Sequence, residues 1–234
     1  MNASNARTRS VCALCTARLA CLTSGLGPSE LEAVEPSIRR SRTPRGDELA
    51  AEGEVAMRVR VIRSGSAFGL RLGVDGQSRP VAMTGRGAAL GLFGLFGQPS
   101  PVAWVAATDC RICEIPMRVL ADVAETHPAF SRHLASTAMA LCGSLAAWSQ
   151  AVRLRGTTNQ LACVLLLLAQ AQDSTCLELP THVALADLLG ARRETVARSL
   201  GVLEAEGGIH RDSGKHYAIE TERLLERLRS TAPA

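Results

Sequence analysis

The most informative stretch of the sequence lies near the C-terminus and reads Gly190-Ala191-Arg192-Arg193-Glu194-Thr195-Val196-Ala197-Arg198. Apolar residues before this stretch predict a helix over 183–189, and the stretch itself begins a second helix that continues to Glu206. Gly190 supplies the turn between them, and residues 209–219 have the pattern of a hairpin with a tight turn. Two helices joined by a short turn and followed by a hairpin are the layout of a winged helix-turn-helix.

This layout predicts which side chains would meet DNA. The first turns of the second helix of such a unit enter the major groove, and Arg193, Glu194 and Arg198 share one sector of that helix. Arginine can bond bidentately to guanine, and glutamate can accept from the amino group of cytosine. Phosphate contacts are expected from Arg192, Thr195 and Lys215. The alternative is a solvated charged face, but the turn glycine, the core spacing and the hairpin together favour DNA recognition.

Composition excludes several other classes of protein. The 234 residues are 47% hydrophobic, which is enough for ordered domains with real cores. No run reaches the roughly 18 apolar residues that a membrane span needs, so we expect no membrane partner. Arginines interrupt any signal-peptide core near the N-terminus, which predicts a cytoplasmic protein. The net charge of +4 permits nucleic-acid binding without proving it.

The cysteines carry the second strong signal. Cys12, Cys15 and Cys21 lie close together near the N-terminus, and Cys110 and Cys113 follow about ninety residues later. Disulfides are uncommon in the cytosol, so these residues indicate metal binding or redox sensing. Soft thiolates suit iron–sulfur clusters or zinc. Cys110 and Cys113 are three residues apart, so on a strand they point to opposite faces.

The segment between the two signals predicts a barrel and a long helix. Short alternating or apolar runs separated by Gly and Asp-Gly turns favour an antiparallel β-barrel, with runs at 57–62, 67–74, 80–83, 102–107 and 111–115. A short helix is expected over 117–125. One long helix is expected from Pro128 to about Arg155, and its apolar stripe predicts a dimer seam. The seam residues would be Leu134, Leu141, Leu145 and Trp148.

Together these segments resemble the CRP/FNR superfamily of bacterial transcription regulators. Arg193–Arg198 is similar to the CRP recognition helix, whereas FNR proteins typically carry Ser at the place of Ala197, which implies half-sites of the TGTGA kind. The run Ile62–Ala67 resembles a strand and turn of the family barrel, and Cys113-Glu114-Ile115-Pro116 followed by Leu120 resembles FNR.

The resemblance implies an α+β fold in four parts. Residues 1–25 would form a Cys-rich arm that binds a cluster, and residues 26–127 a cyclic-nucleotide-binding-like β-barrel (jelly roll). Residues 128–155 would form the dimerisation helix, and residues 156–234 the winged helix-turn-helix. The implied protein is a homodimer that binds palindromic double-stranded DNA, with RNA polymerase as the expected further partner.

The resemblance also implies a cofactor. Cys12-x2-Cys15-x5-Cys21 with one distant cysteine matches the FNR pattern for a [4Fe-4S] cluster that senses oxygen, NO or redox state. Cys113 is favoured as the fourth ligand because it precedes Glu-Ile-Pro, as the FNR ligand does, and Cys110 is the alternative. Zinc, another thiophilic species such as arsenite, or a thiol–disulfide signal on the same cysteines remain open.

Two family features are absent from this sequence. CRP binds cyclic AMP with a Gly-Glu pair for the ribose and an Arg-Ser pair for the phosphate, where this chain has Leu92 and Pro101-Val102. An apolar pocket cannot compensate the desolvation of a phosphate, so no cyclic nucleotide is expected. The FNR dimer helix carries an aspartate where this chain has Leu145, which predicts a tighter, constitutive dimer.

An enzyme is not expected. The His residues at 127, 133, 182, 210 and 216 are scattered and form no nucleophile–base pattern. The rival classes are an iron–sulfur or zinc enzyme that carries a DNA-binding domain, and a DNA-binding protein with a purely architectural zinc.

Overall fold

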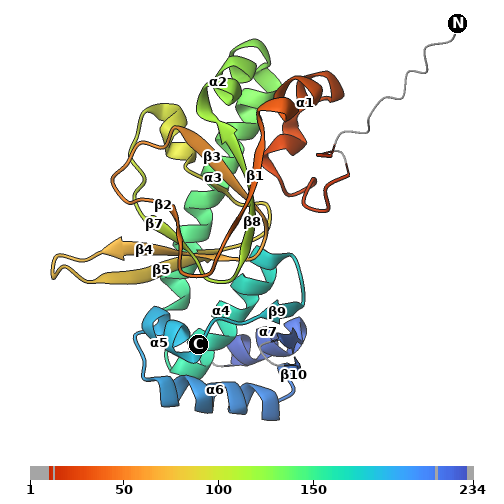
Figure 1. Ribbon diagram of the computed structural model, residues 1–234. Helices are drawn as coiled ribbons and strands as arrows, with labels where there is room; N and C mark the ends of the chain where they lie inside the picture. Colours follow the sequence, from red (N-terminus) through yellow and green to blue (C-terminus); the bar gives the residue numbers. More distant parts are fainter. Residues whose placement is uncertain (1–10, 13, 214–215, 231–234) are drawn as a thin grey trace, which may run out of the picture.

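The computed structural model describes residues 11–12, 14–213 and 216–230. A β-barrel and a winged-helix unit are joined by one long helix, α3, and the N-terminal arm lies against the barrel (Figure 1). None of the helices in these residues is long and apolar enough to cross a membrane.

The arm leads into the barrel through short helical segments. Residues Leu22–Gly25 form the 3-10 helix η1, Pro28–Val34 form α1, and Glu35–Ser37 form the 3-10 helix η2. Pro28 suits the first turn of α1, because the backbone N–H groups of a helix's first turn have no partner within the helix, so proline loses no hydrogen bond there. Leu22 and Leu31 are buried, and these apolar residues fix the arm on the barrel.

Two antiparallel sheets form the barrel. The first has the order β1 (Arg39–Thr43), β8 (Cys110–Pro116), β3 (Arg58–Ser64), β6 (Ala89–Leu90). The second has the order β2 (Glu48–Ala50), β7 (Ala103–Ala106), β4 (Ala67–Leu72), β5 (Ser78–Thr84). The strands expected from apolar runs are present with ends shifted by at most two residues. β1 escaped sequence analysis because its residues, Arg-Arg-Ser-Arg-Thr, form an exposed edge without apolar alternation.

Helices α2 (Met117–Thr126) and α3 (Pro128–Ala151) follow the barrel. The expected long helix is therefore present but ends at Ala151, four residues before Arg155. Gly156 is the N-cap of the next helix. Its φ of 82° is a backbone angle that suits glycine. The 3-10 helix η3 (Leu92–Phe96) lies earlier, after β6.

The C-terminal unit has the winged helix-turn-helix layout. It comprises α4 (Thr157–Gln172), β9 (Cys176–Glu178), α5 (His182–Leu189), α6 (Arg193–Ala205), β10 (Ile209–Ser213), β11 (His216–Ile219) and α7 (Thr221–Ser230). The strands form one sheet in the order β10-β11-β9. Gly190 ends α5 with a φ of 60°, which confirms it as the turn residue.

The assignment of the dimer seam was wrong in part. Leu134 is 5% exposed and Trp148 is 1% exposed, and both are buried within their own chain. Leu141 and Leu145 are half-buried and pack against the same core as Trp148. The strongest apolar residues of α3 therefore stabilise the protomer, and the argument for a tighter dimer from Leu145 loses its basis. The outward face of α3 carries Ala135, Met139, Cys142 and Ala146.

Candidate functional site

One small cavity brings together the cysteines that sequence analysis singled out. Cys12, Cys15 and Cys21 from the arm and Cys113 from β8 all line it, and Ile38 and Ile115 complete its apolar wall. Its volume is about 20 Å³, which is close to the space of one water molecule. The thiols thus meet at one place, but the cavity is closed down around them.

Backbone turns wrap the arm around this cavity. The Cys15 N–H donates to the Cys12 carbonyl at 3.2 Å, and the Cys21 N–H donates to the Arg18 carbonyl at 3.3 Å. The Arg18 guanidinium donates to the Leu26 carbonyl at 3.2 Å and also to the Thr23 carbonyl. Because these bonds hold each turn, the short cysteine spacing becomes a compact loop.

Arginines lie beside two of the thiols. The Arg40 guanidinium donates to Cys12 Sγ at 3.6 Å and to Glu35 Oε1 at 3.2 Å. Burial raises the pKa of Cys12, and the hydrogen bond from Arg40 opposes that rise. Burial raises the pKa of Cys113 to about 11, against the positive charge of Arg63. Both thiols are therefore protonated at neutral pH, and a thiolate formed there would find positive charge nearby.

Cys110 lies on the other side of β8. It belongs to the core that includes Trp148, whereas Cys113 belongs to the core that includes the arm. Cys110 Sγ donates to the Ser66 carbonyl at 3.3 Å, and burial raises its pKa to about 11. The two residues thus point to opposite faces, as their spacing predicted.

The remaining cysteines lie elsewhere. Cys142 and Cys176 are exposed, and Cys163 is half-buried in α4. Cys142 lies on the outward face of α3. Among the residues that the structure describes, no three His, Cys, Asp or Glu side chains lie close enough together to bind a metal ion.

A second site is the outer face of α6. Arg193, Glu194 and Arg198 are exposed there, while Val196 and Leu200 anchor the helix on the core. Arg192 is the exposed residue that caps the start of α6, and Thr195 is half-buried. Lys215 lies outside the described residues. The three predicted base-reading side chains therefore share an accessible surface at the start of α6.

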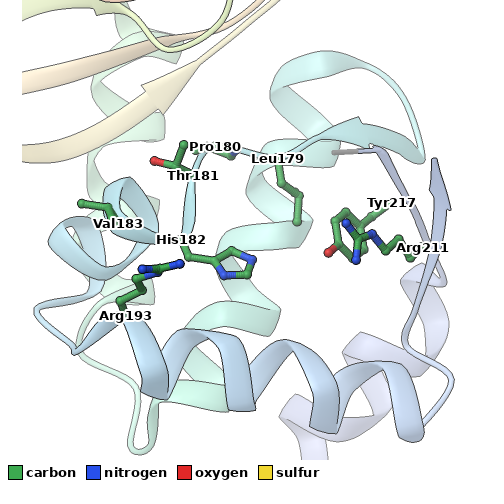
Figure 2. A pocket seen from close by; sticks show the side chains of 8 residues that line it. All are labelled: Leu179, Pro180, Thr181, His182, Val183, Arg193, Arg211 and Tyr217. Atoms are coloured by element: carbon green, nitrogen blue, oxygen red, sulfur yellow. The ribbon is translucent and has the colours of Figure 1, made fainter. Parts of the chain in front are cut away.

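A groove of about 350 Å³ continues this surface toward the wing (Figure 2). His182 and Arg193 approach each other across it, and Arg211 and Tyr217 form its far side. The Thr181 hydroxyl accepts from the Ala184 N–H at 3.3 Å and caps α5. Helix N-termini and cationic side chains are the usual partners of phosphates. Sequence analysis missed His182 and Arg211, although the cap at Thr181 could have pointed to the first.

Two segments of the chain match known protein families. Residues 40–127 match the cyclic nucleotide-binding domain family, and residues 159–228 match the Crp-like helix-turn-helix domain family. The chain belongs to the CRP/FNR family of transcription regulators. Family membership makes it a DNA-binding regulator and not an enzyme, and the α+β fold agrees with that assignment.

Relatives of this CRP/FNR regulator align along most of its length. A probable transcriptional activator of Rhizobium leguminosarum bv. viciae is 26% identical, with 93% of this chain and 92% of that protein covered. A CRP-like cAMP-activated global transcriptional regulator of Mycobacterium tuberculosis is 27% identical, covering 88% and 95%. The structure of FixK2 from Bradyrhizobium japonicum has the same fold, with a TM-score of 0.71 at 20% identity, covering 84% and 98%.

The resemblance places Leu92 and Val102 at the positions where relatives of this CRP/FNR regulator would contact a cyclic nucleotide, and both residues are part of the core of this chain. Leu92 is buried among the apolar residues between the barrel and the arm. Val102 is buried too, and its carbonyl accepts a hydrogen bond from the Ser100 hydroxyl at 2.7 Å. These residues offer neither the carboxylate nor the guanidinium that a ribose phosphate needs.

Proposed function

We propose that this regulator senses oxygen, NO or redox state through a [4Fe-4S] cluster bound by Cys12, Cys15, Cys21 and Cys113. The observation that carries the proposal is the single cavity lined by these thiols, which come from two distant segments. Thiolates are the ligands of such clusters. The regulator would act in the cytoplasm as a homodimer on palindromic DNA, with RNA polymerase as a further partner.

A single tetrahedral ion and a four-iron cluster require different distances between their thiolate ligands. A tetrahedral zinc site with Zn–S bonds of about 2.3 Å holds its sulfurs within about 4 Å of one another. No three described ligand side chains are gathered in that way. In a four-iron cluster each thiolate binds a different iron, so the sulfurs stand farther apart. When bound, the cluster would supply the reactivity toward oxygen and NO.

The residues around the cavity suit that cofactor. A cluster with four thiolate ligands is an anion in a partly buried place, and Arg40 and Arg63 would offset its charge.

The arm would pass the state of the cluster to the dimer helix. The Ser24 hydroxyl lies 3.3 Å from His133 Nε2 on α3. A Cβ added at Gly25 would lie 2.5 Å from the His133 ring, so the arm and α3 are in close contact. The small cavity has to widen to admit a cluster, and the arm would then press on α3 where the dimer forms. A cofactor shifts such an equilibrium only by binding the two arrangements differently.

The dimer would form through the outward face of α3. Ala135, Met139, Cys142 and Ala146 follow a four-three-four spacing, which is the pattern of a helix–helix seam. Met139 is 69% exposed in the protomer, which is unusual for so apolar a side chain.

The decisive experiment is the visible spectrum and the iron and sulfide content of protein purified without oxygen. We expect a brown protein whose absorption bleaches in air, with its affinity for DNA changing as it bleaches. A colourless protein with stoichiometric zinc, or with no metal, would contradict the cluster. Arsenite titration of that colourless protein would then decide between a metalloid and a disulfide signal.

We further propose that cyclic nucleotides do not regulate the chain, although the name of the mycobacterial relative states activation by cAMP. Leu92 and Val102 give the phosphate no partner. Calorimetric titration with cyclic AMP should show no binding at millimolar ligand, and saturable binding would overturn this part.

A further inference from the structure

A three-residue turn of the barrel touches both the cysteine arm and the DNA-binding unit. The turn is Gly85-Arg86-Gly87, between β5 and β6, and we call it the GRG turn. On one side, a Cβ added at Gly87 would lie 2.4 Å from the carbonyl oxygen of Ala20. Ala20 directly precedes the proposed ligand Cys21. The arm at Ala20 therefore lies directly against Gly87, where a side chain would not fit.

On its other side, the GRG turn contacts the C-terminal end of α4. A Cβ added at Gly85 would lie 2.6 Å from the carbonyl oxygen of Ala171, in the last turn of α4. Arg86 Nη2 lies 2.5 Å from Asp173 Oδ2. Asp173 caps α4 with a φ of 48°, and among the described residues it is the only non-glycine residue with a positive φ. This end of α4 is thus fixed by a contact with the barrel.

The GRG turn is also bonded to the strand beside Cys113. The Gly87 N–H donates to the Ile62 carbonyl at 2.8 Å. Ile62 follows Val61, and Val61 pairs with Cys113 across β3 and β8. Both parts of the proposed cluster site, the arm and β8, therefore reach the same turn through backbone contacts.

Helix α4 connects this turn to the recognition helix. The Thr158 hydroxyl on α4 donates to the Ser199 hydroxyl on α6 at 3.2 Å, and both helices contribute to one buried core. Close-packed helices move together because the core between them has no space to absorb a shift. A displacement of α4 would carry the outer face of α6 with it.

One buried polar group of the GRG turn is unsatisfied. Arg86 Nε is buried and has no hydrogen-bond partner among the residues that the structure describes, although Nη2 of the same guanidinium is paired with Asp173. A buried donor without a partner is unfavourable.

We propose that the GRG turn transmits the state of the cysteine arm to α4, and through α4 to the recognition helix. The proposal rests on the proposed function, in that cluster binding or loss supplies the two states of the arm. It adds a route inside one protomer that does not pass through the dimer helix. Gly85 and Gly87 are essential to this route, because a close contact at the backbone transmits a shift that a flexible side chain would absorb.

The first test removes the ion pair between the GRG turn and the end of α4. Arg86→Gln and Asp173→Asn each abolish the ion pair, and asparagine tolerates the positive φ at residue 173. Arg79→Gln is the matched control, because it breaks the exposed pair of Arg79 with Asp75 (2.6 Å) on the β4–β5 hairpin. The quantity measured is the ratio of DNA affinities with and without the cluster. Allosteric ratios are typically about 5–150-fold.

We expect Arg86→Gln and Asp173→Asn to bind iron and sulfide like the wild type while their affinity ratio falls toward 1. Arg79→Gln should keep the wild-type ratio. An unchanged ratio in both interface variants would overturn the proposal, because the signal would then reach the DNA-binding unit by another route.

A second readout does not depend on the cofactor. Hydrogen exchange is measured at the backbone amides of Arg18, Cys21 and Ser24, which are hydrogen-bonded within the arm. Asp173→Asn should change their exchange several-fold, and Arg79→Gln should not. Unaltered exchange in Asp173→Asn would overturn the coupling. Absence of iron from the wild type would instead count against the cluster alone.

Discussion

The cysteine cavity and the DNA-binding surface differ in how the chain builds them. The DNA-binding surface comes from elements that are neighbours in sequence, from α5 to β11. The cysteine cavity joins residues 12–21 to residue 113. A site made within one local unit keeps its shape whenever that unit folds. A site made by docking an arm exists only while the arm is docked, and this makes it the natural place for a switch.

The two regions also differ in charge. The thiols of Cys12 and Cys113 are buried and held in the neutral form. Arg193 and Arg198 are exposed and permanently charged. Metal binding at the first region must therefore release protons, whereas phosphate binding at the second releases counterions. The two equilibria respond to different solution conditions and can be measured separately.

The largest expected effect is at the cysteine cavity. Cys113→Ser should abolish cluster binding, because serine removes the only proposed ligand that the barrel supplies. Cys110→Ser is the matched control on the opposite face of β8 and should retain iron and sulfide at the wild-type level. Iron content of both anaerobically purified variants measures this. Loss of iron in Cys110→Ser with retention in Cys113→Ser would reverse the ligand assignment.

The next effect separates the two faces of α3, the helix between the regions. Trp148 is buried in the protomer, so Trp148→Ala should lower the free energy of unfolding by about 3–5 kcal/mol. Met139→Glu lies on the outward face and should leave the protomer folded while it weakens the dimer. Urea denaturation and size-exclusion chromatography at micromolar concentration measure the two outcomes. A dimeric Met139→Glu protein would place the seam elsewhere.

A smaller effect concerns pH and the thiol of Cys110. Its folded-state pKa of about 11 lies above the ordinary value of 9.0. The neutral thiol thus contributes stability below pH 9 that is lost as the pH rises toward 11. Two pKa units correspond to about 2–3 kcal/mol. Cys110→Ser keeps a hydroxyl for the Ser66 carbonyl but does not titrate in this range. Its stability relative to the wild type should therefore improve by that amount between pH 8 and pH 11, and a constant difference would contradict the assignment.

The DNA-binding surface could be predicted from the sequence, whereas the cysteine cavity could be predicted only in part. Gly190 and the apolar spacing of α5 and α6 are local signals, so the winged helix-turn-helix and its exposed Arg193 were predictable. The cysteines could be chosen by their chemistry and by resemblance. Their shared cavity, and the contact of Ala20 with Gly87, depend on how the arm docks, which no local pattern encodes. The seam failed for a related reason: periodicity shows that Leu134 and Trp148 face a core, but not whose core it is.

The smallest expected effect is at the DNA-binding surface. Glu194 is exposed beside Arg193, and it is the one residue of the reading face that can accept from a base. Glu194→Ala should relax the choice of base at one step of the half-site, at a cost of about 1–3 kcal/mol for the preferred sequence. Arg192→Ala is the control, because a phosphate contact weakens binding to all sequences alike and lowers the salt dependence. Binding to a set of half-sites with single substitutions distinguishes the two patterns. Uniform weakening by Glu194→Ala would mean that the residue positions the helix and that base reading rests on the arginines alone.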